Sequence, residues 1–158
     1  MKQIEHNPSN DCYTFSLNGL KFVLKKRKFD RCKDFFLYAL NSDKCIGYFS
    51  VNEQPDNFKG LEINDNSIVL DEITVPFLDN RMRGYGTFLL NMFLAEYADK
   101  NIYLMVKPFG RHFENFDYYE EMKRLESWYK SYGFITFDEN KDRILMKRAN
   151  KIKFENED

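Results

Sequence analysis

The sequence predicts an α/β fold built on a mixed, largely antiparallel sheet with helices on both faces. Short apolar runs separated by turn signals fill the N-terminal half, which is therefore expected to consist mostly of strands. The C-terminal half alternates strands with helical patterns and closes on a hairpin. Strands followed by strand–helix units are typical of a mixed sheet. We expect a single domain over residues 1–150 and a charged tail over residues 151–158.

The composition narrows the class of protein. The chain is 43% hydrophobic and 31% charged with a formal net charge of −1, which excludes a disordered protein and argues against one that coats nucleic acid. No run approaches the roughly 18 apolar residues of a membrane span, so we expect a cytoplasmic protein with no membrane partner. The three cysteines form no CxxC pair and are expected to be free thiols packed as small core residues. No metal site is predicted.

Two hairpins are predicted in the N-terminal half. Asn18-Gly19 is the strongest two-residue hairpin signal and marks the first, while Asn41-Ser42-Asp43 marks the second. The polar residues 30–34 are expected to form a turn, and residues 52–66 a loop with a short extended piece at 61–63. The expected strands cover residues 13–17, 20–28, 35–40 and 45–51.

The next strand, over residues 67–75, has an irregular apolar pattern. Ile68 and Leu70 share one parity, whereas Ile73 and Val75 share the other. A bulge near Asp71-Glu72 would produce this slip, and bulges are frequent beside active sites.

Two helices are predicted in the C-terminal half. Residues 87–100 are apolar on nearly every side, so this helix is expected to lie between other elements. The second begins at Asp117, which with Glu120 resembles a capping box, and it ends at Gly133. The remaining expected elements are strands at 102–106, 134–137 and 143–146 and a polar loop at 107–116.

A loop of two cationic residues and two glycines precedes the first helix. Arg81-Met82-Arg83-Gly84-Tyr85-Gly86 would present free backbone N–H groups at the positive end of the helix dipole, which predicts an anion site, most often for phosphate. A Walker A loop is rejected because its lysine and hydroxyl residue are missing. A dinucleotide fingerprint is weak because Leu89 occupies the position of the third glycine.

Two motifs resemble those of the GNAT family of acyl-CoA N-acyltransferases. Arg81-x-x-Gly84-x-Gly86 is similar to the family signature Arg/Gln-x-x-Gly-x-Gly/Ala and lies between the irregular strand and the apolar helix. Residues 128–134, Trp-Tyr-Lys-Ser-Tyr-Gly-Phe, resemble the second motif, an aromatic-Tyr-x-x-x-Gly-Phe run. Two motifs in this order are more specific than either alone. The resemblance covers residues 68–147, about half of the chain.

The resemblance implies a cofactor site and a V-shaped splay between the central strands. Backbone amides of residues 82–87 would bind the pyrophosphate of acetyl-CoA, and the two arginines would add charge. The backbone of residues 73–75, where the strands splay, would pair with the pantetheine amides. The implied cofactor-binding residues are Ile73, Thr74, Val75, Arg81, Met82, Arg83, Gly84, Tyr85, Gly86 and Thr87.

The family's chemistry is direct acyl transfer to an amine in a ternary complex, which needs a base for the amine proton and an acid for the departing thiolate. Glu72 is the candidate base, directly or through water, and Tyr129 stands where the family carries its general-acid tyrosine. A solvated carboxylate and a buried core tyrosine are the structural alternatives. The acceptor pocket is expected to be lined by the 107–116 loop, with Phe109, Arg111 and His112 as candidates.

The chain departs from the family on the acceptor side. Residues 25–34 are too short and too charged for the helical pair usual there, and Met122 stands where members often carry Asn. We therefore expect an N-acetyltransferase for an unidentified primary amine. A noncatalytic acyl-CoA-binding module stays open, as does a homodimer. The basic run 25–28 also leaves open an acceptor amine on an aminoacyl-tRNA or another nucleic acid, although such runs are more often solvated strand edges.

Overall fold

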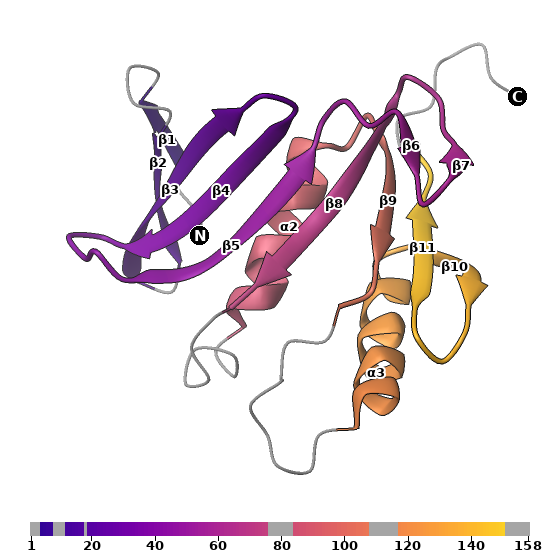
Figure 1. Ribbon diagram of the computed structural model, residues 1–158. Helices are drawn as coiled ribbons and strands as arrows, with labels where there is room; N and C mark the ends of the chain where they lie inside the picture. Colours follow the sequence, from indigo (N-terminus) through magenta and orange to yellow (C-terminus); the bar gives the residue numbers. More distant parts are fainter. Residues whose placement is uncertain (1–3, 8–11, 18, 76–83, 108–116, 151–158) are drawn as a thin grey trace, which may run out of the picture. The chain divides into compact units, whose positions relative to one another are not determined.

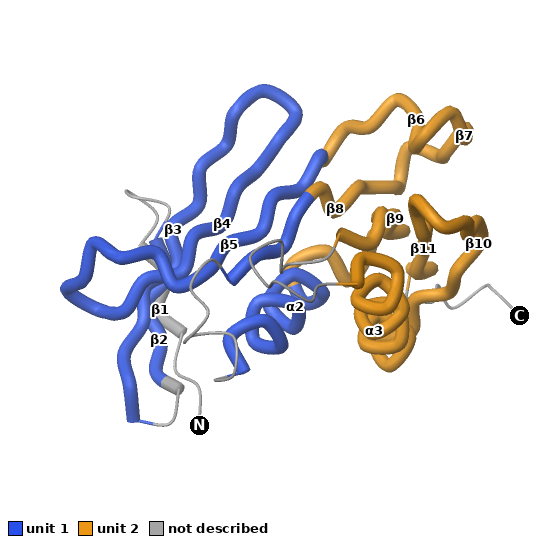
Figure 2. The backbone as a smooth tube through the Cα atoms, turned by 60° about the horizontal axis from the view of Figure 1, so that its bottom comes forward, with its two compact units in different colours: residues 1–52, 72–95 blue, residues 53–71, 96–158 orange. Residues whose placement is uncertain are grey.

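The chain forms two compact units that share one strand. The computed structural model describes all residues except 1–3, 8–11, 18, 76–83, 108–116 and 151–158. Unit 1 comprises residues 1–52 and 72–95, and unit 2 comprises residues 53–71 and 96–158 (Figure 2). Strand β8 (Ser67–Thr74) contributes its first part to unit 2 and its last part to unit 1. The expectation of a single domain over residues 1–150 stays a prediction.

The described part of unit 1 is an antiparallel sheet with helix α2 (Figure 1). Its strands lie in chain order, each paired to the next, and the end of β8 follows β5. Helix α2 lies behind β5 and β8 in Figure 1. The elements are β1 (Ile4–Asn7), β2 (Cys12–Leu17), β3 (Leu20–Phe29), β4 (Cys32–Ala39), β5 (Cys45–Asn52) and α2 (Tyr85–Glu96).

The two predicted hairpins are present, with one correction. Leu17 pairs with Leu20 across the expected Asn-Gly turn, where Gly19 has φ +80°, a value that glycine adopts without strain. The turn expected over residues 30–34 is present but covers only residues 30–31, because Phe29 already pairs with Cys32 and β4 begins there. Asp30 makes this short turn possible by adopting a φ of 56°. Strand β1 was not predicted.

Stacked phenylalanines fill the space between the sheet of unit 1 and α2. Phe15 stacks on Phe22 at 5.6 Å and on Phe88 of the helix at 4.9 Å between ring centroids. Farther along the helix, Phe93 meets Phe49 edge-on at 5.7 Å. Both kinds of aromatic contact are favourable beyond the burial of area. The chain's many aromatic residues therefore form a core here.

Unit 2 contains a mixed sheet, a short ribbon and the second helix. The first part of β8 pairs in parallel with β9, and β11 pairs antiparallel with both β9 and β10. The elements are β6 (Asn57–Phe58), β7 (Leu61–Glu62), β9 (Asn101–Met105), α3 (Tyr118–Lys130), β10 (Ile135–Glu139) and β11 (Ile144–Arg148).

The β6–β7 ribbon adds a small apolar cluster to the sheet of unit 2. Phe58, only 3% exposed, packs with Val69 and Leu145, and Tyr103 and Phe137 close around it. Ile68 to Leu70 of β8 are all buried, which requires cover on both faces of the strand. A segment expected to be mostly loop therefore completes a core.

Helix α3 begins and ends as the sequence predicts. The side chain of Asp117 accepts a hydrogen bond from the backbone N–H of Glu120 at 3.0 Å, as an N-cap does. Gly133 has φ +93°, the left-handed conformation that ends helices. The other predicted helix, over 87–100, differs: α2 covers Tyr85–Glu96, and Lys100 N–H bonds to Tyr97 O in a turn. No helix in the described ranges is long and apolar enough to cross a membrane.

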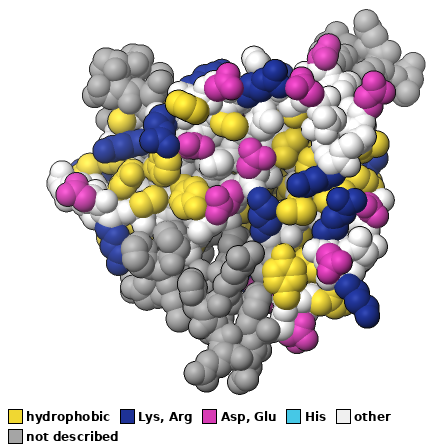
Figure 3. Space-filling model, in the orientation of Figure 1, with side chains coloured by type: hydrophobic (Ala, Val, Ile, Leu, Met, Phe, Trp, Pro, Cys, Tyr) yellow, Lys and Arg dark blue, Asp and Glu magenta, His cyan; other side chains and the backbone are white. Residues whose placement is uncertain are grey.

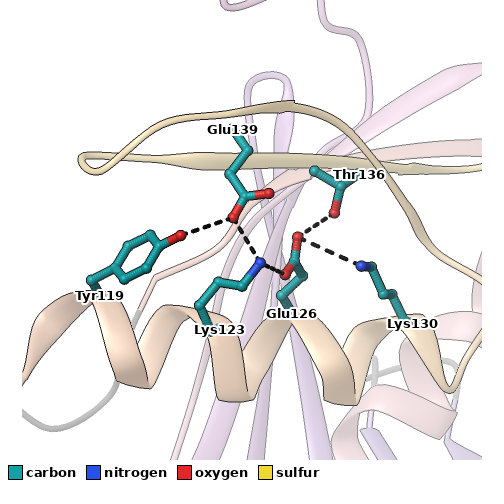
Figure 4. Close-up of polar contacts among 6 residues, drawn as sticks. All are labelled: Tyr119, Lys123, Glu126, Lys130, Thr136 and Glu139. Atoms are coloured by element: carbon teal, nitrogen blue, oxygen red, sulfur yellow. Dashed lines mark hydrogen bonds and ion pairs between the residues drawn. The ribbon is translucent and has the colours of Figure 1, made fainter.

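A polar network joins α3 to β10 in unit 2 (Figure 4). The carboxylate of Glu126, 2% exposed, contacts Lys123 Nζ at 2.6 Å and accepts a hydrogen bond from the Thr136 hydroxyl at 2.6 Å. Lys123 also reaches Glu139 at 2.7 Å. The members drawn are Tyr119, Lys123, Glu126, Lys130, Thr136 and Glu139. These bonds compensate the desolvation of a buried charge.

Candidate functional site

Helix α2 of unit 1 begins directly after Gly84, and no described residue accepts a hydrogen bond from its first backbone amides. Gly84 has φ +80°, and its carbonyl accepts the first helical hydrogen bond, from Phe88 N–H at 3.0 Å. The N–H groups of Tyr85, Gly86 and Thr87 therefore precede the helical ladder and point toward the helix start. The first turn carries no acidic residue. These features suit an anion. Arg81, Met82 and Arg83 lie outside the described residues.

The two glycines leave the backbone approachable. A Cβ added at Gly84 would meet no atom within 4 Å, and one at Gly86 would reach only Val75 Cγ2, at 4.0 Å. A ligand can therefore approach this backbone where side chains would stand in other sequences. Tyr85 anchors the helix start to the sheet, since its ring meets that of Phe22 edge-on at 6.0 Å.

The end of β8 alternates between a buried and an exposed face. Ile73 and Val75 are each 5% exposed, whereas Glu72 is exposed. Gly47 of β5 packs so closely that a Cβ there would lie 2.7 Å from Leu89 Cδ1 of α2 and 2.9 Å from the Thr74 carbonyl oxygen. The absence of a side chain at position 47 thus sets the path of the segment predicted to bind pantetheine. The predicted bulge near residues 71–72 stays a prediction.

In unit 2, the pairing of β8 with β9 stops before either strand ends. The last pair is Leu70 with Leu104. The carbonyl of the next residue, Asp71, accepts a hydrogen bond from Lys107 Nζ at 2.9 Å. A side chain thus satisfies a backbone group that a strand would otherwise satisfy. This end of the ladder agrees with the predicted splay of the central strands.

Glu72, the candidate base, is oriented by two hydroxyl groups of unit 1. Its Oε1 accepts hydrogen bonds from Tyr48 Oη at 3.0 Å and from Thr74 Oγ1 at 3.1 Å. Burial, followed by the hydrogen bond to Glu72, raises the pKa of Tyr48, which therefore stays a protonated donor. No described residue hydrogen-bonds Oε2. One carboxylate oxygen is thus fixed and the other can accept a proton.

Tyr129, the candidate acid, lies in the last turn of α3 in unit 2. It is 4% exposed, and its ring packs on Trp128 at 5.1 Å and on Phe134 at 5.5 Å. Burial raises the pKa of its phenol, so the hydroxyl keeps its proton. Burial is the only influence on this pKa, to which no hydrogen bond or charge contributes among the described residues. The ring is a core residue, while the hydroxyl can still donate a proton.

The remaining predictions concern the acceptor pocket, the cysteines, Met122 and metal binding. Phe109, Arg111 and His112 lie outside the described residues. The cysteines are free but only half-buried, so their expected place in the core is wrong. Met122 is fully buried in α3, where an asparagine side chain would need a partner. Within the described ranges, no three His, Cys, Asp or Glu side chains gather as metal ligands would.

Sequence reasoning missed Tyr48 and Gly47. A glycine inside a strand often marks a close backbone approach, so Gly47 carried a usable signal. The sequence carried no such signal for Tyr48, because the contact of Tyr48 with Glu72 depends on how β5 pairs with β8.

The fold is that of the GNAT-type acyltransferases. The chain matches an acetyltransferase from Thermus thermophilus with a TM-score of 0.52 and 15% sequence identity, over 75% of this chain and 64% of that one. It thus spans less than two thirds of that protein. An acyl-CoA N-acyltransferase from Pseudomonas aeruginosa matches with a TM-score of 0.46, 15% identity and coverage of 75% and 68%. No family model and no curated protein sequence matches the chain. The predicted resemblance is confirmed at the level of the fold.

Proposed function

We propose that this protein is an N-acetyltransferase that transfers the acetyl group of acetyl-CoA to a primary amine. The start of α2 carries the proposal, because no described residue accepts a hydrogen bond from the amides that follow the positive-φ Gly84, on a fold shared with an acetyltransferase. The pyrophosphate would bind these amides, with Arg81 and Arg83 as further cations. The backbone of Ile73 to Val75 would align the pantetheine arm. The CoA moiety supplies the thioester that is attacked.

The reaction needs two proton transfers. Glu72 would accept a proton from the acceptor ammonium, directly or through water, with Oε1 held by Tyr48 and Thr74. The free amine then attacks the thioester carbonyl, so that a C–N bond forms and the C–S bond breaks. Tyr129 would give a proton to the departing thiolate, and the proton that the amide nitrogen loses after the C–N bond has formed would restore the phenol.

Acetyl-CoA affinity of a Gly86→Glu variant tests the cofactor site. The structure favours this position over Gly84, because a side chain at Gly84 would strain a backbone with φ +80°, whereas Gly86 has room. A carboxylate among the free amides repels the pyrophosphate, so we expect acetyl-CoA binding, measured by calorimetry, to fall by at least about 100-fold.

Asn91→Glu is the matched control, since it adds the same charge at an exposed position within α2. It should bind acetyl-CoA like the wild type. Equal affinity of the Gly86→Glu variant and the wild type, with both folded by circular dichroism, would contradict the cofactor assignment. Mass spectrometry of the purified protein for bound CoA gives independent support.

The acceptor is sought with a panel of small amines, peptides and aminoacylated RNA. Acetyl transfer to any of them supports the enzyme. CoA binding without transfer to any acceptor would instead favour the noncatalytic binding module.

A further inference from the structure

The β3–β4 hairpin of unit 1 concentrates positive charge. Residues 21–34 contain seven basic and two acidic side chains, a net charge of +5 in a chain whose formal net charge is −1. The proposed acetyl transfer uses none of these basic residues. Charge segregated in this way produces a local positive potential that attracts polyanions.

One face of the hairpin combines this charge with aromatic rings. Lys25 Nζ lies 5.1 Å from the centre of the Tyr38 ring, and the Arg27 guanidinium lies 5.5 Å from that of Phe36. Phe36 in turn lies 5.9 Å from Tyr48 on β5. These rings are half-buried and face away from α2, whose side is filled by the phenylalanine core. Figure 3 shows hydrophobic side chains interspersed with basic and acidic ones on the face that Figure 1 turns forward.

The far end of the hairpin places two like charges at paired positions. Lys28 and Lys33 occupy directly opposed positions in the β3–β4 register. Like charges at such positions destabilise a sheet. Beside them, the side chain of Phe29 is 75% exposed. The tip of the hairpin thus places cationic side chains next to an exposed aromatic ring.

Protection of a sheet edge does not account for this pattern. Lysines on an edge strand prevent unwanted strand pairing, but β3 is not an edge strand, because it pairs with β2 on one side and with β4 on the other. Lys33 lies on β4, which is likewise paired on both sides, with Lys28 opposite on β3 and Val51 opposite on β5. The charge thus extends into a strand that has no edge to protect.

We propose that the open face and tip of the β3–β4 hairpin bind single-stranded RNA. Phosphates would contact Lys25 and Arg27, while bases stack on Phe29 and on the aromatic rings between the cations. Lys28 and Lys33 point to the other face of the hairpin, where Lys33 Nζ lies 5.5 Å from the centre of the Phe35 ring. Interleaved cations and rings suit a strand whose bases are exposed, the form in which RNA is most often recognised. An acidic polypeptide would form ion pairs with the cationic side chains but would not stack on the aromatic rings. Arg27 pairs with Asp34 at 3.4 Å, yet such an exposed pair is weak and phosphate can compete for it.

Fluorescence anisotropy of a labelled uridine oligonucleotide of about 20 nucleotides, titrated with the full chain, tests the proposal. Binding should weaken linearly on a log–log scale between about 50 and about 200 mM salt. The double variant Lys25→Gln/Arg27→Gln should bind more weakly and reduce the salt slope by about 1.4, the value for two phosphate contacts on a single strand. Phe29→Ala should weaken binding by about tenfold through lost stacking and leave the slope unchanged.

Lys141→Gln/Lys147→Gln is the matched control, because it removes the same net charge from unit 2 and Lys147 likewise lies over an aromatic ring, that of Phe137. This variant should bind like the wild type. The proposal is overturned by no binding at about 50 mM salt, by equal losses in the two double variants, or by poly-glutamate or duplex RNA binding as tightly as the single strand. RNA affinity is measured without acetyl-CoA, so a lack of RNA binding would leave the acetyltransferase assignment intact. Likewise, a lack of acetyl-CoA binding would leave the RNA proposal intact.

Discussion

Single side chains of unit 1 turn an ordinary carboxylate into a candidate base. Glu72 is exposed, and Tyr48 and Thr74 both donate to the same oxygen of its carboxylate. Two fixed donors limit the rotamers of a side chain that would otherwise move freely. Orientation of this kind is what a proton acceptor needs, because transfer requires a geometry close to a hydrogen bond.

Replacing Glu72 and Tyr48 in turn separates proton transfer by the carboxylate from the orientation of that carboxylate. Glu72→Gln should lower kcat/KM by about 10²- to 10⁴-fold, because the amide cannot accept the amine proton. Tyr48→Phe, which removes one net hydrogen bond, should lower it by only about fivefold. Steady-state rates with the best acceptor from the panel give both values. Acetyl-CoA affinity should change in neither variant, and full activity of Glu72→Gln would remove this residue from the mechanism.

At the scale of a single element, the buried carboxylate of Glu126 on α3 contributes to the stability of unit 2. Burial alone would raise the pKa of Glu126, but the hydrogen bonds from Lys123 and Thr136 and the charges of Lys123 and Lys130 outweigh it and hold the pKa below its ordinary value. Figure 4 shows how these groups converge on the carboxylate from α3 and β10. The network therefore fixes the helix to the hairpin of unit 2.

This lowered pKa predicts how stability depends on pH. A carboxylate whose folded pKa is lowered stabilises the protein above its unfolded pKa of about 4.3 and loses that contribution as the pH falls through the folded pKa. Urea unfolding of the wild type should therefore show a falling free energy between about pH 5 and about pH 3. Glu126→Gln should be less stable at neutral pH by about 1–3 kcal/mol and show a shallower dependence. Identical pH profiles for the two proteins would contradict this role.

At the scale of the whole molecule, β8 runs through both compact units. Residues Ser67 to Asp71 belong to unit 2 and Glu72 to Thr74 to unit 1. One half of a strand cannot keep its backbone hydrogen bonds to neighbouring strands once the other half has lost its extended geometry. The predicted single domain should therefore unfold in one cooperative transition.

The only tryptophan allows this to be measured. Trp128 lies on α3, so its fluorescence reports on unit 2, while far-UV circular dichroism reports on both units, because helix α2 lies in unit 1 and helix α3 in unit 2. The two signals should give coincident urea midpoints. Two separated midpoints would show that the units unfold independently and that the single-domain prediction is wrong.

Local signals predicted most of the elements. The Asn-Gly turn, the Asp117 cap and Gly133 each act on backbone within a few residues, and the structure confirms all three features. Short-range reasoning placed the end of one turn wrongly: polar side chains suggested a turn over residues 30–34, whereas the turn covers 30–31 and residues 32–34 pair into β4. It also missed β1, because strand pairing depends on a partner rather than on composition.

The sequence by itself determined the order of strands and helices, the glycine-rich entry to α2 and the resemblance to acyltransferases, because turn residues, caps and periodicity act locally. Only the tertiary structure decided which side chains meet: that Tyr48 and Thr74 hold Glu72, that Gly47 admits the Thr74 carbonyl, and that two lysines oppose each other on the β3–β4 hairpin. These contacts depend on register between strands, and a shift of one residue would turn each of these side chains to the other face.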